Sequence, residues 1–470
     1  MIASLSFSLE SNETPRYQQL QQQLLEAIEQ GRLAVGDKLP SSRTFARSLG
    51  VSRSVVIQTY EQLIAEGVLR SEPKRGIFVA PVERISVSAE PAATLVESSR
   101  KGGFDSGVDV SQFPSKEWAA SMRRAWLSPD PNVLMGSYRA GLPALRQAIV
   151  AYLYALRGLS CLPEQVVITA GSRDAMALLA HALQSSCRHW FLEEPTYPPL
   201  HASLANVAVQ PLAVQSDGAL PPTQVSDWAA VLTPNRQYPL GISYSSPVRE
   251  QWLDALQAGQ GFIIEDDYDN EFLYQGRASV PLMQLAQHRG SAQERIFYVG
   301  SLSKVLFRGL RMGFIIAPLS QVDRLLFSQQ ALGVSASLPM QPVVADFMTN
   351  GSFYRHLNRM RRHYRERRDT LLALLSQHLE PWFEWDKPSG GMHVIAYFKS
   401  HIRQPEQVWR QLDQACAEQG LALSWLHQHY HSLPEPLPRP GLLLGFTGPS
   451  TEQLDQWVRL IALHAKKIML

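Results

Sequence analysis

The residue best suited to do chemistry is a lysine that stands alone in a long part of the chain. Between Lys116 and Lys387 the only lysine is Lys304, which closely follows the apolar run IFYVGS (296–301). A lysine that forms a Schiff base must be presented by a rigid element, and its amine must be available in the neutral form. A single lysine in a loop is ordinarily a surface charge, but the residues around Lys304 favour a covalent anchor.

Groups that bind anions lie close to this lysine. Ser301 and Ser303 supply hydroxyls, and Arg311 supplies a planar cation seven residues after Lys304. A second anion site is predicted in VVITAGSRDAMALL (166–179), where a strand, a glycine-containing turn and a helix follow one another. The first turn of such a helix offers free N–H groups and a positive dipole to a phosphate. The contact candidates in this turn are Gly171, Ser172 and Arg173. Many nucleotide-binding turns share this pattern.

Acidic residues stand at the carboxyl end of the apolar strand predicted in GFIIED (261–266) and directly after it. Open α/β sheets bind their ligands at the carboxyl ends of the strands. Together with a Schiff-base lysine and a phosphate site, such acids suit pyridoxal phosphate (PLP). Asp266 can keep the pyridine nitrogen protonated, which makes the ring an electron sink, and Tyr268 can reach the phenolic oxygen. The alternative is a metal site of Asp266, Asp267 and Asp269, which the lack of a nearby histidine disfavours, so no metal is predicted.

Two more residues are candidates for contact with the ring. Asn235, in TPNRQYPLG (233–241), could donate to the phenolic oxygen, although it could equally be a turn residue. Tyr197, in FLEEPTYPP (191–199), could stack on the ring, or it could be an ordinary core or loop aromatic.

The elements that must position these residues follow an α/β pattern. Helical stretches such as SRDAMALLAHALQ (172–184) lie between short apolar strands, and the clearest strands are 166–169, 189–194, 230–234, 261–266, 296–301 and 313–318. Continuously apolar strands that alternate with helices predict a mostly parallel sheet covered on both faces.

The N-terminal residues predict three short helices followed by two strands. The first helix spans 15–30, Ser41 or Ser42 caps the second, Ser52 caps the third, and VLRSEPKRGIFVAP (68–81) forms two strands around a Lys-Arg-Gly tip. This order is that of a winged helix-turn-helix, which places the start of its recognition helix in the major groove of DNA.

Positive residues gather where such a domain meets DNA. Between Lys38 and Arg53 there are four Lys or Arg residues and no acid, although the first 80 residues carry nine Lys or Arg against eight Asp or Glu. Phosphate neutralisation and guanine recognition need this local charge. The DNA-binding candidates are Arg43, Ser52, Arg53, Ser54, Lys74 and Arg75. A trihelical domain used only for protein contacts is the alternative, which the agreement of turn, cap and wing signals disfavours.

Composition and residue spacing limit the remaining possibilities for domain organisation, membrane insertion and cysteine chemistry. Residues 81–107 are small, polar and Pro-containing, which predicts a linker between domains. No apolar run approaches the roughly 20 residues that span a bilayer, and the N-terminus has no secretory pattern. The three cysteines lack C-x-x-C spacing, which argues against a disulfide framework or a zinc site and for a cytoplasmic protein.

Two sets of motifs resemble known families. GDKLPSSR (36–43) and LGVSRSVV (49–56) belong to a run of some 65 residues that resembles the GntR-type winged helix. The order and spacing of the later motifs resemble fold-type I aminotransferases, and from about residue 15 onward the whole chain is similar to the MocR/GabR group of regulators. The most specific later stretches are 136–158, EEPTYP (193–198), TPNRQYPLG, IIEDDYDNEF (263–272), GSLSK (300–304), RGLRMG (308–313) and 355–372.

The resemblance implies roles for particular residues. Arg43, Arg53 and the wing-tip Gly76 would contact double-stranded operator DNA. Lys304 would be the catalytic lysine that carries PLP as a Schiff base, with Asp266 at the pyridine nitrogen, Tyr268 at the phenolic oxygen and Arg311 at the phosphate.

The resemblance also implies an architecture and a function. The winged helix-turn-helix would span 12–80, and an α/β aminotransferase-like domain would span 108–470, with a small α+β subdomain from roughly 345. We expect a homodimer, head-to-tail as in related regulators, that senses PLP or its adduct with an amine or amino acid and thereby controls operator binding. The rival interpretations are a working aminotransferase with a vestigial DNA-binding head and a DNA-binding regulator whose second domain is empty.

One position departs from the aminotransferase pattern. These enzymes usually carry an Arg before the apolar-Gly-Phe strand near the C-terminus, where it clamps the carboxylate of the substrate. In PRPGLLLGFTG (438–448) the expected position is Leu443, and Arg439 is the nearest substitute. This difference favours a sensed cofactor over turnover of an amino acid.

The segment from Arg355 to Arg368 holds seven arginines and one acid. We interpret it as the solvated face of a long helix that joins the two subdomains, and an accessory surface for DNA or for the other domain is the alternative.

Overall fold

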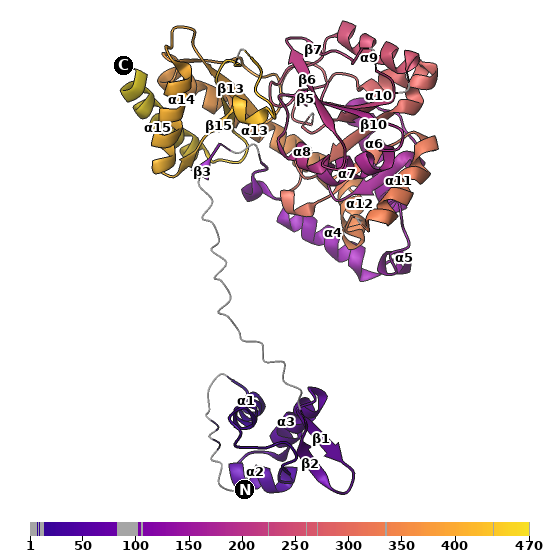
Figure 1. Ribbon diagram of the computed structural model, residues 1–470, viewed down its shortest axis with the longest axis vertical. Helices are drawn as coiled ribbons and strands as arrows, with labels where there is room; N and C mark the ends of the chain where they lie inside the picture. Colours follow the sequence, from indigo (N-terminus) through magenta and orange to yellow (C-terminus); the bar gives the residue numbers. More distant parts are fainter. Residues whose placement is uncertain are drawn as a thin grey trace. The chain divides into compact units, whose positions relative to one another are not determined.

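A computed structural model describes residues 14–81, 102–104 and 107–469, with gaps at 224, 260, 270, 334–335 and 436, together with Phe7 and Leu9. The chain divides into two compact units, Met1–Ser98 and Ser99–Leu470 (Figure 1). Most of the predicted linker lies outside the described residues. Its last part does not: strand β3 (Gly102–Gly103) pairs with β14 (Leu421–Ala422) and so belongs to the second unit.

The first unit is a trihelical domain with a β-hairpin. Its elements are α1 (Arg16–Glu29), α2 (Ser42–Leu49), α3 (Arg53–Ala65), β1 (Leu69–Glu72) and β2 (Gly76–Val79). Ser41 caps α2 by accepting a hydrogen bond from the backbone N of Thr44 at 3.2 Å, and Gly50 ends that helix in the left-handed conformation with φ 64°. Leu24, Phe45 and Leu63 share one core.

The second unit is built on an eight-stranded sheet with the strand order β4-β11-β10-β9-β8-β5-β6-β7. Strands β10, β9, β8, β5 and β6 run parallel, whereas β11 is antiparallel to both of its neighbours. The strands are β4 (Val166–Thr169), β5 (His189–Glu194), β6 (Val209–Gln215), β7 (Gly218–Ala219), β8 (Trp228–Leu232), β9 (Phe262–Asp266), β10 (Ile296–Ser301) and β11 (Gly313–Ile316). The predicted α/β class is confirmed.

Helices cover both faces of this sheet. Because successive strand side chains point to opposite faces, Val167 belongs to one core, with side chains of α7 and α11, whereas Ile168 belongs to the other, with side chains of α6, α9 and α12. The helices of this part are α4 (Ser115–Leu127), α5 (Pro131–Leu134), α6 (Pro143–Arg157), α7 (Ser172–Leu183), α8 (Pro199–Ser203), α9 (Ser246–Ala258), α10 (Leu282–Leu285), α11 (Leu319–Leu332) and α12 (Gln341–Thr349).

A smaller α+β part follows. Its sheet has the order β12-β13-β16-β15, and helices α14 (Pro405–Glu418) and α15 (Thr451–Met469) pack with it. The strands are β12 (Phe383–Glu384), β13 (His393–Phe398), β15 (Ser424–Trp425) and β16 (Gly441–Gly445). We call this four-stranded sheet the small sheet. No helix among the described residues is both long enough and apolar enough to cross a membrane.

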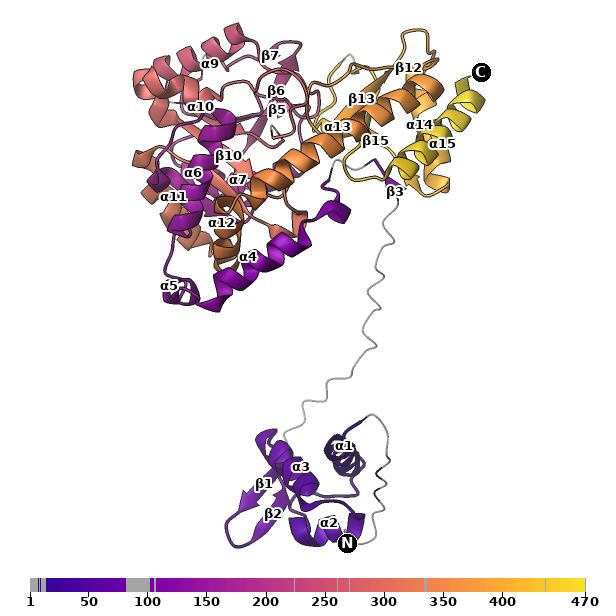
Figure 2. The same ribbon diagram turned by 180° about the vertical axis from the view of Figure 1, so that it is seen from behind.

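The arginine-rich segment lies in one long helix, α13 (Ser352–His378), which runs from the large part into the small part (Figure 2). The prediction of a solvated face is wrong for Arg367 and Arg368, which are 8% and 1% exposed. Arg367 donates to Asp109 at 2.7 Å, and Arg368 donates to the carbonyl of Pro388 at 2.9 Å. These two arginines therefore pair with distant groups of the second unit, which their burial requires.

Candidate cofactor and DNA sites

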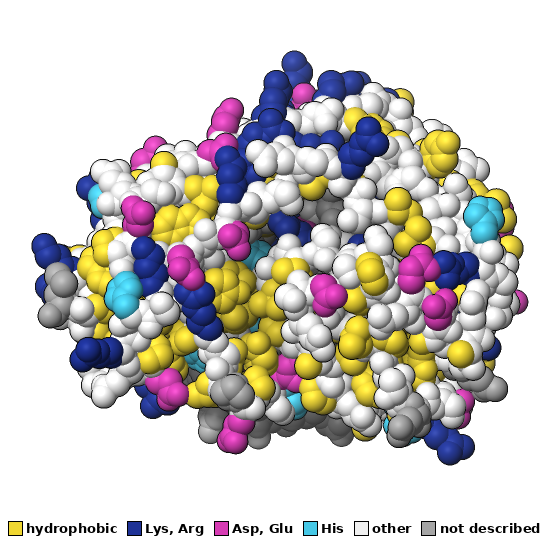
Figure 3. Space-filling view, turned by 90° about the horizontal axis from the view of Figure 1, so that it is seen from above, with side chains coloured by type: hydrophobic (Ala, Val, Ile, Leu, Met, Phe, Trp, Pro, Cys, Tyr) yellow, Lys and Arg dark blue, Asp and Glu magenta, His cyan; other side chains and the backbone are white. Residues whose placement is uncertain are grey.

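A cavity of about 490 Å³ lies where the carboxyl ends of the large sheet meet the small sheet. Figure 3 shows the surface hollowed near its centre, with Lys or Arg atoms inside the hollow. The structure places most of the predicted cofactor residues in its lining: Gly171, Ser172, Arg173, Tyr197, Asp266, Tyr268, Ser301, Ser303, Lys304 and Arg311. They come from the carboxyl ends of β9 and β10, from the start of α7 and from the loops that follow β4, β5, β9 and β10.

The loop between β10 and β11 presents Lys304 and Arg311. Its base is closed by a hydrogen bond from the backbone N of Leu302 to the carbonyl of Met312 at 3.0 Å. Arg311 has φ 48°, a left-handed conformation that non-glycine residues seldom adopt and that functional sites often hold. The loop thus holds the Arg311 backbone in a strained geometry at the edge of the cavity.

A glycine brings this loop against the start of α7. A Cβ on Gly313 would lie 2.9 Å from the backbone of Gly171, so only glycine permits the approach. Helix α7 begins at Ser172 with no side-chain cap, and the N–H groups of its first turn have no intrahelical partner. The hydroxyls of Ser301 and Ser303, the guanidinium of Arg311 and these N–H groups together form a corner of the cavity that is suited to a phosphate.

Asp266 and Tyr268 supply polar atoms that lack partners inside the protein. Both Oδ1 of Asp266 and the hydroxyl oxygen of Tyr268 are buried, and neither atom has a hydrogen-bond partner among the described residues. Burial, with the neighbouring Asp267, raises the pKa of Asp266 to about 7, and burial raises the pKa of Tyr268. An acceptor and a donor left unmatched in a cavity lined by Lys304 fit the pyridine nitrogen and the phenolic oxygen of PLP.

Asp267 faces away from this corner. It accepts a hydrogen bond from Nε of Arg157 at 2.7 Å, and the hydroxyl of Tyr298 also donates to it. Nε of Arg236 lies 3.6 Å from Oδ1 of Asp269, which forms an ion pair. These cations pair with two of the three acids that were the alternative metal ligands, and no group of three or more possible ligands forms among the described residues.

Asn235 is the one predicted cofactor residue that does not line the cavity. Its amide donates to Glu265 at 2.9 Å and to Asp267 at 3.3 Å, and its side chain is buried. The structure thus places Asn235 among the groups that hold the strand ends together.

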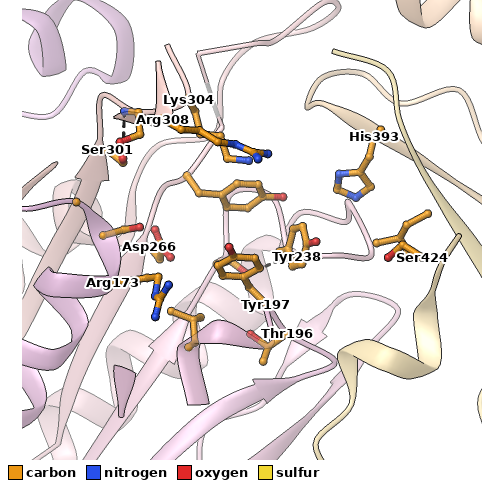
Figure 4. A pocket seen from close by; sticks show the side chains of 18 of the residues that line it. Arg173, Thr196, Tyr197, Tyr238, Asp266, Ser301, Lys304, Arg308, His393 and Ser424 are labelled. Carbon is orange, nitrogen blue, oxygen red and sulfur yellow. Dashed lines mark hydrogen bonds between the residues drawn. The ribbon is translucent and has the colours of Figure 1, made fainter. Parts of the chain in front are cut away.

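Sequence reasoning missed several residues of the lining. Tyr238, in the quoted TPNRQYPLG motif, has its ring centroid 5.7 Å from that of Tyr197 and 5.6 Å from that of Tyr268. His393 and Ser424 come from the small sheet, opposite Lys304 (Figure 4). The other missed residues are Phe104, Ala170, Thr196, Leu200, Thr233, Arg308 and Gly445. Thr196, Thr233, Tyr238 and Arg308 stood within motifs that were singled out as specific, and that was the available signal.

The expected carboxylate-clamp position also lies at the cavity. Leu443 contributes to the lining, in a small cluster with Ile395 and Leu426. Arg439 lies elsewhere: it donates to the carbonyl of Phe398 and pairs with Glu384 at 2.6 Å. Arg439 therefore does not replace a cation at Leu443.

The burial of His393 is expected to make the free energy of unfolding of the second unit depend on pH. This histidine is buried and donates to the carbonyl of Pro239 at 2.7 Å, and burial lowers its pKa to about 4. Above pH 6.5 the ring is neutral in both folded and unfolded chains, but as the pH falls only the unfolded chain takes up the proton. We expect this group alone to cost about 2 kcal/mol of stability between pH 7 and pH 5.

The raised pKa values of Asp266, Asp269 and Glu271 act in the opposite direction, so a comparison with His393→Gln is needed. All ten tryptophans lie in the second unit, and their fluorescence reports its unfolding in urea. The wild type should lose about 2 kcal/mol relative to the variant over this pH range. Equal pH slopes for the two proteins would show that His393 is not held neutral.

The first unit exposes the predicted DNA-binding residues. Arg43, Ser52, Arg53 and Ser54 are exposed around the start of α3, and Nε of Arg53 lies 3.3 Å from Oγ of Ser42. In the wing tip, Lys74 has φ 63°, and Arg75 forms an ion pair with Glu72 at 2.6 Å. Lys38 lies over the ring of Phe78 and beside Gly76, which links the wing to the turn before α2.

Both units match known sequence families. Residues 16–79 match bacterial regulatory proteins of the gntR family, and residues 107–425 match aminotransferase class I and II. Solved structures share the fold of the second unit. The α-aminoadipate aminotransferase LysN of Thermus thermophilus has a TM-score of 0.66 at 23% identity, covering 78% of this chain and 92% of its own. A multiple substrate aminotransferase of Thermococcus profundus has a TM-score of 0.68 at 20% identity, covering 80% and 93%.

Relatives with similar sequences extend over both units. The probable rhizopine catabolism regulatory protein MocR of Rhizobium meliloti is 33% identical over 460 residues, which cover 93% of this chain and 91% of that protein. The pyridoxine biosynthesis transcriptional regulator PdxR of Corynebacterium glutamicum is 30% identical over 407 residues, covering 84% and 86%. This chain therefore belongs to the MocR-type transcriptional regulators, in which a gntR-family winged helix precedes a domain of the aminotransferase class I and II family.

Proposed function

We propose that this chain is a regulator that holds PLP on Lys304 and binds operator DNA through Arg43, Ser52, Arg53, Ser54, Lys74, Arg75 and Gly76. Occupation of the cavity by PLP, or by PLP with an amine, changes operator binding. The observation that carries the proposal is the pair of unmatched polar atoms on Asp266 and Tyr268 in a cavity that Lys304 also lines. The name of the Corynebacterium relative, which refers to pyridoxine biosynthesis, supports a response to this cofactor.

In this proposal, different residues of the cavity bind the phosphate and the ring of PLP. Ser301, Ser303, Arg311 and the first turn of α7 hold the phosphate, while Asp266 and Tyr268 orient the ring and Tyr197 packs against it. When bound, PLP supplies an electron-withdrawing ring and an aldehyde carbon that reacts with amines. Lys304 is the amine that this chain provides.

Control of DNA binding requires a difference in affinity. A ligand shifts an equilibrium between two arrangements of the chain only if it binds one arrangement more tightly than the other. We propose that the part of the chain that changes between these two arrangements lies in the second unit. The protein is a cytoplasmic homodimer of head-to-tail arrangement, and its two winged helix-turn-helix domains bind two half-sites of the operator.

Replacing Asp266 with Asn tests the ring contact. The amide is neutral and cannot pair with a protonated pyridine nitrogen, so we expect the affinity for PLP to fall about 10- to 100-fold, as for loss of one charge-assisted hydrogen bond. Equilibrium dialysis of the intact protein with PLP measures this. The control is Asp254→Asn, which removes an exposed acid on α9. Equal affinities of the Asp266 variant and the wild type would remove Asp266 from the site.

A further inference from the structure

The small sheet forms one wall of the cavity. His393 pairs with Gly445 in the register of β13 and β16, and Leu443 pairs with Ile395 on one side and Ser424 on the other. Paired residues, and residues two apart on one strand, share a face of a sheet. The four residues His393, Ser424, Leu443 and Gly445 therefore lie on one face, and all four line the cavity.

This wall carries no charge in the described lining. Leu443 and Gly445 are apolar, and Ser424 is a neutral hydroxyl within 3.3 Å of the ring nitrogen of His429. His393 is neutral at physiological pH because burial lowers its pKa to about 4. The Lys and Arg residues of the described lining all belong to the large part of the unit: Arg173, Lys304, Arg308 and Arg311.

The uncharged wall limits what can face it. A carboxylate directed at Leu443 would lose its hydration without gaining a cation on this wall, which is costly. Alkyl groups lose nothing there, because Leu443, Leu200 and Phe104 all line the same cavity. A hydroxyl can be accommodated as well, since Ser424 offers a hydrogen-bonding partner.

We infer that the cavity takes, beside PLP, a primary amine whose remaining part is uncharged, and that Leu443 discriminates against amino acids. The inference rests on the proposed function, because PLP gives the site its preference for amines. It assigns to Leu443 a specificity role and to the small sheet the recognition of the far end of the ligand.

Matched pairs of amines test this. Alaninol and alanine differ only in a hydroxymethyl group against a carboxylate, and 4-aminobutan-1-ol and 4-aminobutanoate form a second pair. Each is titrated into the PLP-loaded full chain, and the readout is the shift of the visible absorption band, which needs no turnover. We expect each alcohol to half-saturate the shift at a concentration about tenfold or more below that of its acid.

Two variants give a cation to the wall. Leu443→Arg should invert the preference so that the acids act at lower concentration, and Ser424→Lys places a cation on the same face should the first variant fail to fold. The control is Leu463→Arg, which makes the same change at an exposed position of α15 and should keep the wild-type preference.

The outcomes separate the inference from the proposed function. A band that shifts with the acids as readily as with the alcohols, or with neither, overturns the inference and leaves PLP binding intact, as does an unchanged preference in the folded variants. The absence of any band in wild-type protein incubated with PLP overturns both.

Discussion

Replacing Lys304 with Ala is expected to abolish covalent attachment of PLP and the visible absorption band that accompanies it. Of the described residues that line the cavity, Lys304 is the only lysine, so no neighbouring amine in that set can substitute. Borohydride reduction of the PLP-incubated protein followed by mass spectrometry should find one labelled site per chain in the wild type and none in the variant. Noncovalent PLP should still bind weakly through Arg311 and the start of α7.

The matched control is Lys116→Ala, which removes an exposed lysine of α4 and should leave the label at Lys304. A labelled Lys304→Ala protein would place the cofactor amine elsewhere. Because the control loses the same side chain, general effects of charge or of lysine number are separated from the role of this site.

Replacing Arg53 with Ala is expected to weaken operator binding by about 5- to 100-fold, the range for one arginine that contacts a base or phosphate. Arg53 is exposed at the start of the recognition helix α3. If Arg53 neutralises a phosphate, the variant should also show a shallower dependence of affinity on salt, because fewer counterions are released. Fluorescence anisotropy with promoter DNA at several salt concentrations measures both effects.

Arg410→Ala serves as the control because it removes the same charge from an exposed position in α14 of the second unit. The control should bind DNA as the wild type does. Equal affinity and equal salt slope for Arg53→Ala and Arg410→Ala would mean that α3 does not present Arg53 to the duplex.

The part of the site that the sequence predicted consists of residues next to strand ends. Asp266 is the last residue of β9, and Gly171 and Lys304 follow apolar strands within a few positions. The carboxyl ends of parallel strands meet at one edge of a sheet. Local pattern was therefore sufficient to bring them together. The cap of α2 by Ser41 followed an equally local rule.

The part that the sequence did not predict depends on long-range packing. His393 and Ser424 reach the cavity only through the register of the small sheet, which joins strands far apart in the chain. Asn235 stands in the expected motif, but its amide is taken by Glu265 and Asp267. The direction of one side chain depends on partners that the motif itself does not contain.

Buried arginines show the same limit. A run of arginines in a helix suggests a solvated face, yet Arg367 is buried against Asp109, which lies some 250 residues earlier in the chain. Burial of such a cation is acceptable only when a partner is present, and composition does not reveal that partner.

Operator binding by the intact, purified chain, measured with and without PLP, decides whether the cofactor controls DNA binding. We expect PLP to change the affinity for promoter DNA by about 5- to 150-fold, the usual size of a coupling between two sites, and Lys304→Ala to lose most of this change. Identical affinities for promoter DNA with and without saturating PLP, in a wild-type protein shown to carry the cofactor, would contradict it.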